Sequence, residues 1–176
     1  MREISFEERF GVMGTDSYRL STAKKIEIAT NLVDCMISDK EVSDDAARFI
    51  SIWCITGNRY KKAFLDVWNM VLDNYTPTGT PLLYRACDKL QRIREGKVAS
   101  YCENFETSLK FKPEKIVVLD TNLALQGNGP HELFVFSFFP LCKLMEKHNV
   151  SCRYLGEEEY IVRETYYGAQ VFNRVY

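Results

Sequence analysis

The spacing of apolar side chains divides the chain into a helical first part and a strand-rich second part. From Ser21 to Asn74 apolar residues recur at steps of three and four, the period of an amphipathic helix. The recurring positions form three groups: Ile26, Ala29, Leu32, Val33 and Met36; Ala46, Phe49, Ile50 and Trp53; and Phe64, Val67, Trp68, Val71 and Leu72. The pattern predicts three helices whose apolar faces form a core. Ser43 is the expected N-cap of the second helix, and Asn58 that of the third.

The segment YTPTGTP, residues 75–81, ends the helical pattern with two prolines and a glycine. Beyond it the segments are shorter and richer in β-branched and aromatic residues. The strand candidates are LLYRAC, KVASYC, KIVVLDT, ELFVFSF, EYIVRE and AQVFNRVY, and the helix candidates are FETSLKF and PLCKLMEKH. We therefore predict an α+β protein in which N-terminal helices pack on a mixed, mostly antiparallel, split β-sheet core.

The whole chain of 176 residues is expected to form a single domain. Its helical part, residues 1–76, and its β-rich part, residues 77–176, are joined without a long linker, so the helices are expected to pack on the sheet. Apolar residues make up 46% of the chain and charged residues 27%, a composition typical of a globular protein with a substantial core.

Charge and hydropathy narrow the partners and the compartment. The formal net charge of -1 gives no general attraction to nucleic acid or to anionic lipid. The first residues, MREISFEERFGVMG, lack the apolar core of a signal peptide, and no stretch approaches the roughly 18 apolar residues of a membrane span. We expect a cytoplasmic protein with no membrane partner.

The six cysteines are expected to be reduced and mostly packed thiols. Cys142, His148 and Cys152 lack a fourth ligand at a spacing typical of zinc sites, so no metal is expected. A cysteine nucleophile would combine Cys102 with His131, but the sequence indicates no third group that would orient this pair.

Charged side chains in two predicted strands are the candidate functional groups. Arg85 lies inside the apolar segment LLYRAC, where an unpaired guanidinium is costly to bury, so it requires an anion. Glu157, Glu158 and Glu159 crowd the start of the strand that continues with Tyr-Ile-Val. Because side chains alternate along a strand, Glu157 and Glu159 are expected on one face and Glu158 on the other. Two carboxylates can therefore line one cleft.

The order of these motifs resembles that of the ADP-ribosyltransferases of the arginine-serine-glutamate class, over about residues 80 to 176. The family's motifs are an aromatic residue followed by arginine, a Ser-Thr-Ser strand followed by a phenylalanine, and Glu-x-Glu before apolar residues. The residues at these positions are Tyr84 and Arg85, Ser100 and Phe111, and Glu157 and Glu159. The chain is similar in particular to the small mono-ADP-ribosyltransferases of tailed bacteriophages, so the resemblance implies an ADP-ribosyltransferase-like core and, for a phage protein, the host cytoplasm.

The resemblance implies an enzyme that uses NAD as co-substrate, breaks the nicotinamide-ribose bond and transfers ADP-ribose to an acceptor. The transition state is cationic, as in glycoside cleavage, and a nearby carboxylate stabilises it. By resemblance Glu159 would bind the ribose 2′-hydroxyl and stabilise this cation. Glu157 would position or deprotonate the nucleophile.

The resemblance also implies which residues bind NAD. Arg85 would hold a phosphate or the ribose with its forked donors. Ser100 would orient the catalytic glutamate and the nicotinamide side, and Phe111 or a nearby aromatic residue would pack against the ring. Tyr84 and Tyr101, which flank these motif positions, would belong to the same NAD site.

The acceptor is expected to be an arginine side chain of a protein, because in the family a first glutamate in Glu-x-Glu receives a guanidinium. RNA ends and small guanidino compounds are the alternatives. A basic run could contact RNA, but its helical spacing is more typical of a solvated face. This run consists of Lys89, Arg92, Arg94 and Lys97.

Two hypotheses of other classes remain open. Tyr101 and Cys102 replace two residues of Ser-Thr-Ser, and Ala86 stands where glycine often follows the arginine. These departures suit a catalytically inactive binding or inhibitory protein on the same fold. Alternatively, the helices of residues 21–74 bind a partner and the rest is scaffold.

The enzyme hypothesis makes a geometric demand that the two alternatives do not make. It requires Arg85, Ser100 and Glu159 to converge on one cleft.

Overall fold

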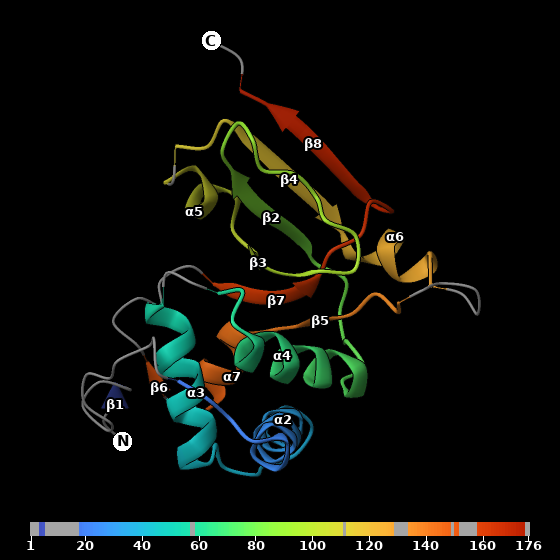
Figure 1. Cartoon of the computed structure of the whole chain (residues 1–176). Helices are drawn as coiled ribbons and strands as arrows, with labels where there is room; N and C mark the ends of the chain where they lie inside the picture. The colour runs from blue at the N-terminus through green and yellow to red at the C-terminus, as the bar shows by residue number, and fades with distance from the viewer. Residues whose placement is uncertain are drawn as a thin grey trace. The chain divides into compact units, whose positions relative to one another are not determined.

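The chain forms two compact units, each drawn in Figure 1. Unit 1 consists of Met1–Asn74 and Leu141–Gly156, and unit 2 of Tyr75–Pro140 and Glu157–Tyr176. The computed structural model describes residues 4–5, 18–56, 59–110, 112–128, 134–148, 150–151 and 158–174.

Helices dominate unit 1. They are α2 (Thr22–Ile37), α3 (Asp44–Ile55), α4 (Lys62–Asn74) and α7 (Leu141–Lys147). The Ser43 side chain caps α3 by accepting a hydrogen bond from the backbone N–H of Ala46 at 3.1 Å. The three predicted N-terminal helices and the Ser43 cap are thus confirmed, whereas Asn58 lies outside the described residues. A short parallel pair, β1 (Ile4–Ser5) with β6 (Val150–Ser151), also belongs to this unit.

Aromatic rings from α3 and α4 fill the core of unit 1. Four buried rings meet edge-on or tilted with centroids 5.1 to 5.8 Å apart, the geometry that aromatic quadrupoles favour: Phe49, Trp53, Phe64 and Trp68. At the margin of this core, the Nζ atom of Lys25 lies 2.7 Å from Asp66 of α4, and their hydrogen bond lowers the pKa of Asp66. The predicted apolar faces therefore do form a core.

A six-stranded sheet forms the centre of unit 2. Its strand order is β5-β7-β3-β2-β4-β8, and every pairing among the described residues of this sheet is antiparallel. The strands are β2 (Leu82–Cys87), β3 (Val98–Cys102), β4 (Lys115–Asp120), β5 (Phe138–Phe139), β7 (Glu159–Arg163) and β8 (Ala169–Asn173). Two short helices, α5 (Phe105–Leu109) and α6 (Thr121–Gln126), follow β3 and β4. The α+β class is confirmed, and the ADP-ribosyltransferase-like core stays a prediction.

The segment ELFVFSF contributes less strand than its composition predicts. Of residues 134–139, only Phe138 and Phe139 pair with β7, and they form β5. The reason lies in Asn128, whose side chain accepts from the backbone N–H of Phe136 at 2.7 Å and donates to its carbonyl at 2.9 Å. A side-chain amide thus replaces a neighbouring strand as the partner of this backbone.

The turn before β8 depends on Gly168. Its φ is +83°, and a Cβ atom there would lie 2.8 Å from the backbone N of Ala124 and 2.9 Å from the carbonyl O of Asp120. Both contacts are with backbone, so neither can relax by a side-chain rotation. Glycine is therefore required by both conformation and space.

We expect Gly168→Ala to lower the free energy of unfolding by about 3 kcal/mol, since it adds a clash to the strain of a positive φ. Gly79→Ala is the matched control. Gly79 has a φ of +77° but no atom within 4 Å of the added Cβ. It should therefore cost only about 1 kcal/mol. Urea denaturation followed by circular dichroism measures both, and equal losses would contradict the close approach at Gly168.

Candidate functional site

The register of the sheet decides which predicted site residues share a face. Tyr84 pairs with Cys102, Cys102 with Glu159, and Ser100 with Ile161. Directly paired residues lie on the same face, and neighbours along a strand alternate. Tyr84, Ser100 and Glu159 therefore occupy one face, called here the Ser100 face.

The Ser100 face contains a hydrogen bond between Ser100 and Glu159. The Ser100 Oγ atom donates to Oε2 of Glu159 at 2.5 Å, across the pairing of β3 with β7. The Glu159 side chain is 2% exposed, and a buried carboxylate requires such donors. The bond fixes the orientation of this carboxylate at the start of β7.

The chain enters β7 through an unusual backbone conformation at Glu158. Its φ is +51°, in the left-handed region, and its side chain is exposed. A non-glycine residue in this region costs of order 1 kcal/mol or more, so the surrounding structure must hold it there. The conformation separates exposed Glu158 from buried Glu159.

Tyr84 extends the Ser100 face away from Glu159. It pairs with Cys102 on one side and with Val118 on the other. Its ring meets that of Phe105, at the start of α5, with centroids 5.5 Å apart and planes at 61°. Tyr84 therefore lies between β3, which carries Ser100, and β4, and its ring contacts α5.

Arg85 lies on the opposite face, called here the Arg85 face. Its Nη1 atom donates to the carboxylate of Glu164, at 3.1 Å from Oε2 and 3.3 Å from Oε1, and to the carbonyl O of Arg92 at 3.4 Å. Glu164 is 0% exposed. The anion that the sequence predicts as the partner of Arg85 is thus the buried carboxylate of Glu164, in the same unit.

Tyr101 belongs to the same buried network. Its hydroxyl donates to Oε2 of Glu164 at 2.8 Å, and the backbone N of Arg94 approaches Oε1 at 3.5 Å. Burial, together with the charge of Glu164, raises the pKa of Tyr101 well above its ordinary value. The phenol therefore stays protonated and serves as a donor.

The structure brings together some of the predicted site residues and separates others. Tyr84, Ser100 and Glu159 share the Ser100 face, whereas Arg85 and Tyr101 point to Glu164 on the Arg85 face. Arg85 therefore does not converge with Ser100 and Glu159 on one cleft.

Two predicted site residues, Glu157 and Phe111, lie outside the described residues. Their roles stay predictions. His131, the partner suggested for a Cys102 nucleophile, lies outside them as well, while Cys102 is buried and its thiol donates to the carbonyl O of Asn104 at 3.3 Å.

Sequence reasoning missed Glu164, although a signal was present. Glu164 ends the segment EYIVRE and stands five positions after Glu159, so alternation along an extended chain predicts opposite faces for the two. An acidic residue facing away from the expected site was a candidate partner for Arg85.

In the described parts of the chain, no group of three or more His, Cys, Asp or Glu side chains could hold a metal ion. No helix in those parts is long and apolar enough to cross a membrane.

Comparison with protein-family models, curated proteins and solved structures finds no match to the chain. The function proposed below therefore rests on the arrangement of the chain's own residues and on the motif resemblance.

We expect Arg85→Met to lower the free energy of unfolding by about 3 kcal/mol, because it leaves the buried Glu164 charge without its guanidinium. Arg92→Met is the matched control, since Arg92 is exposed and contacts Arg85 through its backbone carbonyl. The double variant Arg85→Met with Glu164→Leu should regain part of the loss, because no unpaired charge remains. Denaturation midpoints measure all three; an unchanged midpoint for Arg85→Met would indicate that Arg85 is held for a ligand instead.

Proposed function

We propose that the chain is a mono-ADP-ribosyltransferase, which cleaves NAD at the nicotinamide-ribose bond and transfers ADP-ribose to an acceptor. One observation carries the proposal: the buried Glu159 carboxylate accepts a 2.5 Å hydrogen bond from Ser100. This is the pairing that the resemblance to arginine-serine-glutamate transferases implies for these two motifs. It joins residues 59 positions apart in the chain.

The proposed role of Glu159 follows from the charge that develops during cleavage. As neutral nicotinamide leaves, positive charge spreads over the ribose ring, as in glycoside cleavage. A carboxylate held in a poorly solvated place stabilises such a charge more strongly than one in water, and it needs no reorganisation. Ser100 would hold the carboxylate in the orientation that meets the ribose.

The proposal gives Arg85 a different role from the one expected at first. Since Arg85 is paired with Glu164 on the Arg85 face, it is assigned to the support of the sheet and not to NAD. It would act on the reaction only by holding β2 and β3 in place. The phosphates of NAD would then need cations from elsewhere in the protein.

The acceptor in this proposal is an arginine of a cytoplasmic protein, with Glu157 receiving its guanidinium. RNA ends and small guanidino compounds are alternatives that the same chemistry accommodates.

One observation favours a second candidate function. Arg85 and Tyr101, two of the expected NAD contacts, are both engaged by Glu164. A catalytically inactive protein on the same fold, which binds or inhibits a partner, would tolerate this arrangement. It would bind no NAD.

We expect Glu159→Gln to reduce transfer by about 100-fold or more, because the amide keeps the shape of the side chain and loses its charge. The assay incubates purified protein with labelled NAD and a cell lysate, and follows both label transfer and free nicotinamide. Glu158→Gln, an exposed neighbouring carboxylate, is the matched control and should leave both signals unchanged.

Three outcomes of this assay are decisive. Label that depends on Glu159 but not on Glu158 supports the transferase. Full activity of Glu159→Gln removes Glu159 from the mechanism. If the wild-type protein releases no nicotinamide and calorimetry detects no NAD binding, the inactive binding protein is the better description.

Ser100→Ala should slow nicotinamide release by about tenfold, because it removes one hydrogen bond that orients the carboxylate. The loss should appear in kcat with little change in KM, since the proposal assigns Ser100 to orienting Glu159 and not to holding NAD. Ser108→Ala, which removes a hydroxyl that donates to the carbonyl O of Phe105, is the control. A pure KM effect would assign Ser100 to NAD binding instead of positioning.

A further inference from the structure

The last strand of the sheet, β8, lies at its edge. It pairs with β4 on one side, and no described residue pairs with it on the other (Figure 1). Two large apolar side chains are exposed there, Val171 at 48% and Phe172 at 54%. A strand edge of this kind can accept a further strand through its backbone hydrogen-bonding groups.

The hydrogen bonds to β4 show which backbone groups of β8 face inward. The carbonyl O of Gly168 accepts from the backbone N of Asp120 at 2.8 Å, and the backbone N of Arg174 donates to the carbonyl O of Glu114 at 2.9 Å. Both bonds join residues that are opposed in the continued β4–β8 register. In an antiparallel pair, every second residue bonds to the partner strand and the residues between turn their backbone groups away. The even-numbered residues of β8 therefore bond to β4.

The odd-numbered residues of β8 direct their backbone groups to the open edge. They are Ala169, Val171 and Asn173. The N–H of Ala169 is already used, since it donates to the carbonyl O of Tyr166 at 3.2 Å. No described residue bonds to the N–H and C=O groups of Val171 and Asn173 at this edge. These groups are available to a further strand.

The edge lacks the features that keep strands from pairing with other chains. Protected edges commonly carry a lysine, a proline or a bulge. The segment AQVFN of β8 contains no charged residue and no proline, although 27% of the whole chain is charged. Its five residues pair with β4 in one unbroken register. No like charges would therefore oppose one another if an identical strand paired with it.

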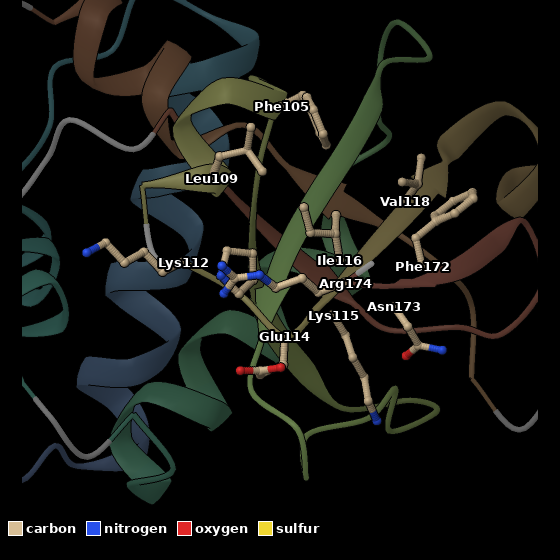
Figure 2. A pocket seen from close by; sticks show the side chains of 11 residues that line it. Phe105, Leu109, Lys112, Glu114, Lys115, Ile116, Val118, Phe172, Asn173 and Arg174 are labelled. Atoms are coloured by element: carbon tan, nitrogen blue, oxygen red, sulfur yellow. The ribbon is translucent and has the colours of Figure 1, made fainter. Parts of the chain in front are cut away.

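Phe172 lies beside a hollow on the Ser100 face. A cavity of about 610 Å³ is bounded by α5, β4 and β8, and Val118 and Phe172 are among the residues that line it. Figure 2 shows Phe172 next to Val118, whereas Asn173 extends from β8 in the other direction. The register agrees, because Phe172 pairs with Ile116 and Asn173 with Lys115. A further strand beside β8 would cover part of the exposed Phe172 ring.

We propose that two copies of the chain associate through β8, as antiparallel strands about a two-fold axis, and join their six-stranded sheets into one. Val171 of each copy pairs with Asn173 of the other, and the two residues exchange both backbone hydrogen bonds. Phe172 then lies opposite Phe172 of the second copy, at a position without backbone bonds, where opposed side chains lie closest. Opposed aromatic side chains stabilise such a strand pair.

The bonded N–H of Ala169 selects this register over its nearest alternative. In the alternative, Val171 lies opposite Val171 of the second copy, and Ala169 lies opposite Asn173. Because the N–H of Ala169 is bonded within its own turn, the carbonyl O of each Asn173 would lack a donor. The alternative would also place Phe172 opposite Gln170, so the two registers predict different neighbours for Phe172.

The axis is perpendicular to the joined sheet and keeps the Ser100 faces of both copies on the same side. The two hollows then flank the pair of Phe172 rings. The contact uses neither Ser100 nor Glu159, so the proposal does not rest on the transferase activity.

Sedimentation velocity of the full chain, at concentrations from about 1 to about 500 µM, measures the association. A contact made by one pair of strands is small, so we expect a dissociation constant on the order of 10 µM. The chain should be monomeric at the low end of the series and dimeric at the high end. A chain that stays monomeric throughout overturns the proposal.

Opposite charges at residue 172 test the register. Phe172→Glu and Phe172→Lys each place like charges opposite one another, and each alone should weaken association by about tenfold or more. An equimolar mixture should regain association as a mixed dimer, because a carboxylate then faces an ammonium group across the axis. Leu90→Glu is the matched control, since Leu90 is 89% exposed in unit 2 and lies outside β8. It should change the dissociation constant by less than about twofold.

Val171→Pro tests the backbone pairing with Phe172 unchanged. Proline removes the outward N–H of Val171, which makes no bond to β4, so β8 should stay in its own sheet while association is lost. Circular dichroism checks that each variant keeps the wild-type secondary structure, and Val171→Pro decides if the Phe172 variants do not fold. Unchanged association of Val171→Pro, no gain from mixing the two Phe172 variants, or equal weakening by Leu90→Glu overturns the proposed pairing.

Discussion

Unit 2 depends on the buried carboxylate of Glu164. This group is 0% exposed, and it accepts hydrogen bonds from Arg85 of β2, Tyr101 of β3 and the backbone N of Arg94 in the loop between them. A charge removed from water is tolerated only when it is paired and hydrogen-bonded, so the Glu164 carboxylate needs all of these donors. Two backbone hydrogen bonds of 2.8 Å, from Gly96 to Glu164 and from Glu164 to Lys97, reinforce the same junction.

The Glu164 network and the candidate site lie on opposite faces of the same strands. The network holds β2, β3 and the end of β7 together on the Arg85 face. On the Ser100 face, the pairing of the same two strands, β3 and β7, places Ser100 within hydrogen-bonding distance of Glu159. A cation that supports the sheet and a carboxylate proposed for chemistry are thus separated by the thickness of one sheet, and a change at Arg85 would reach the site only through the strands.

Local patterns in the sequence were sufficient for most of the secondary structure. Three-and-four spacing predicted α2, α3 and α4, and Ser43 marked the start of α3, because both signals depend on nearby residues. LLYRAC predicted β2 with its observed bounds. Helix α6 differs from the prediction, which extends the strand KIVVLDT to Thr121. Asp120 instead caps a helix there by accepting a hydrogen bond from the backbone N of Leu123. The basic run around Arg92 lies in a loop, so its helical spacing had no structural meaning.

The sequence alone shows that Arg85 needs an anion, whereas only the fold decides which group supplies it. An arginine in an apolar strand requires an anion, but Arg85 meets Glu164, 79 positions away, because strand order and register bring them to one face. Alternation likewise predicted faces along each strand, yet only pairing between strands decided that Ser100 shares its face with Glu159 and not with Arg85. The pocket bounded by α5, β4 and β8 is a further case, since these elements are separate in the chain and enclose a volume only when the sheet is assembled. Local spacing acts within a few residues, but partners and cavities arise from contacts between distant segments, which the periodicity of a chain does not encode.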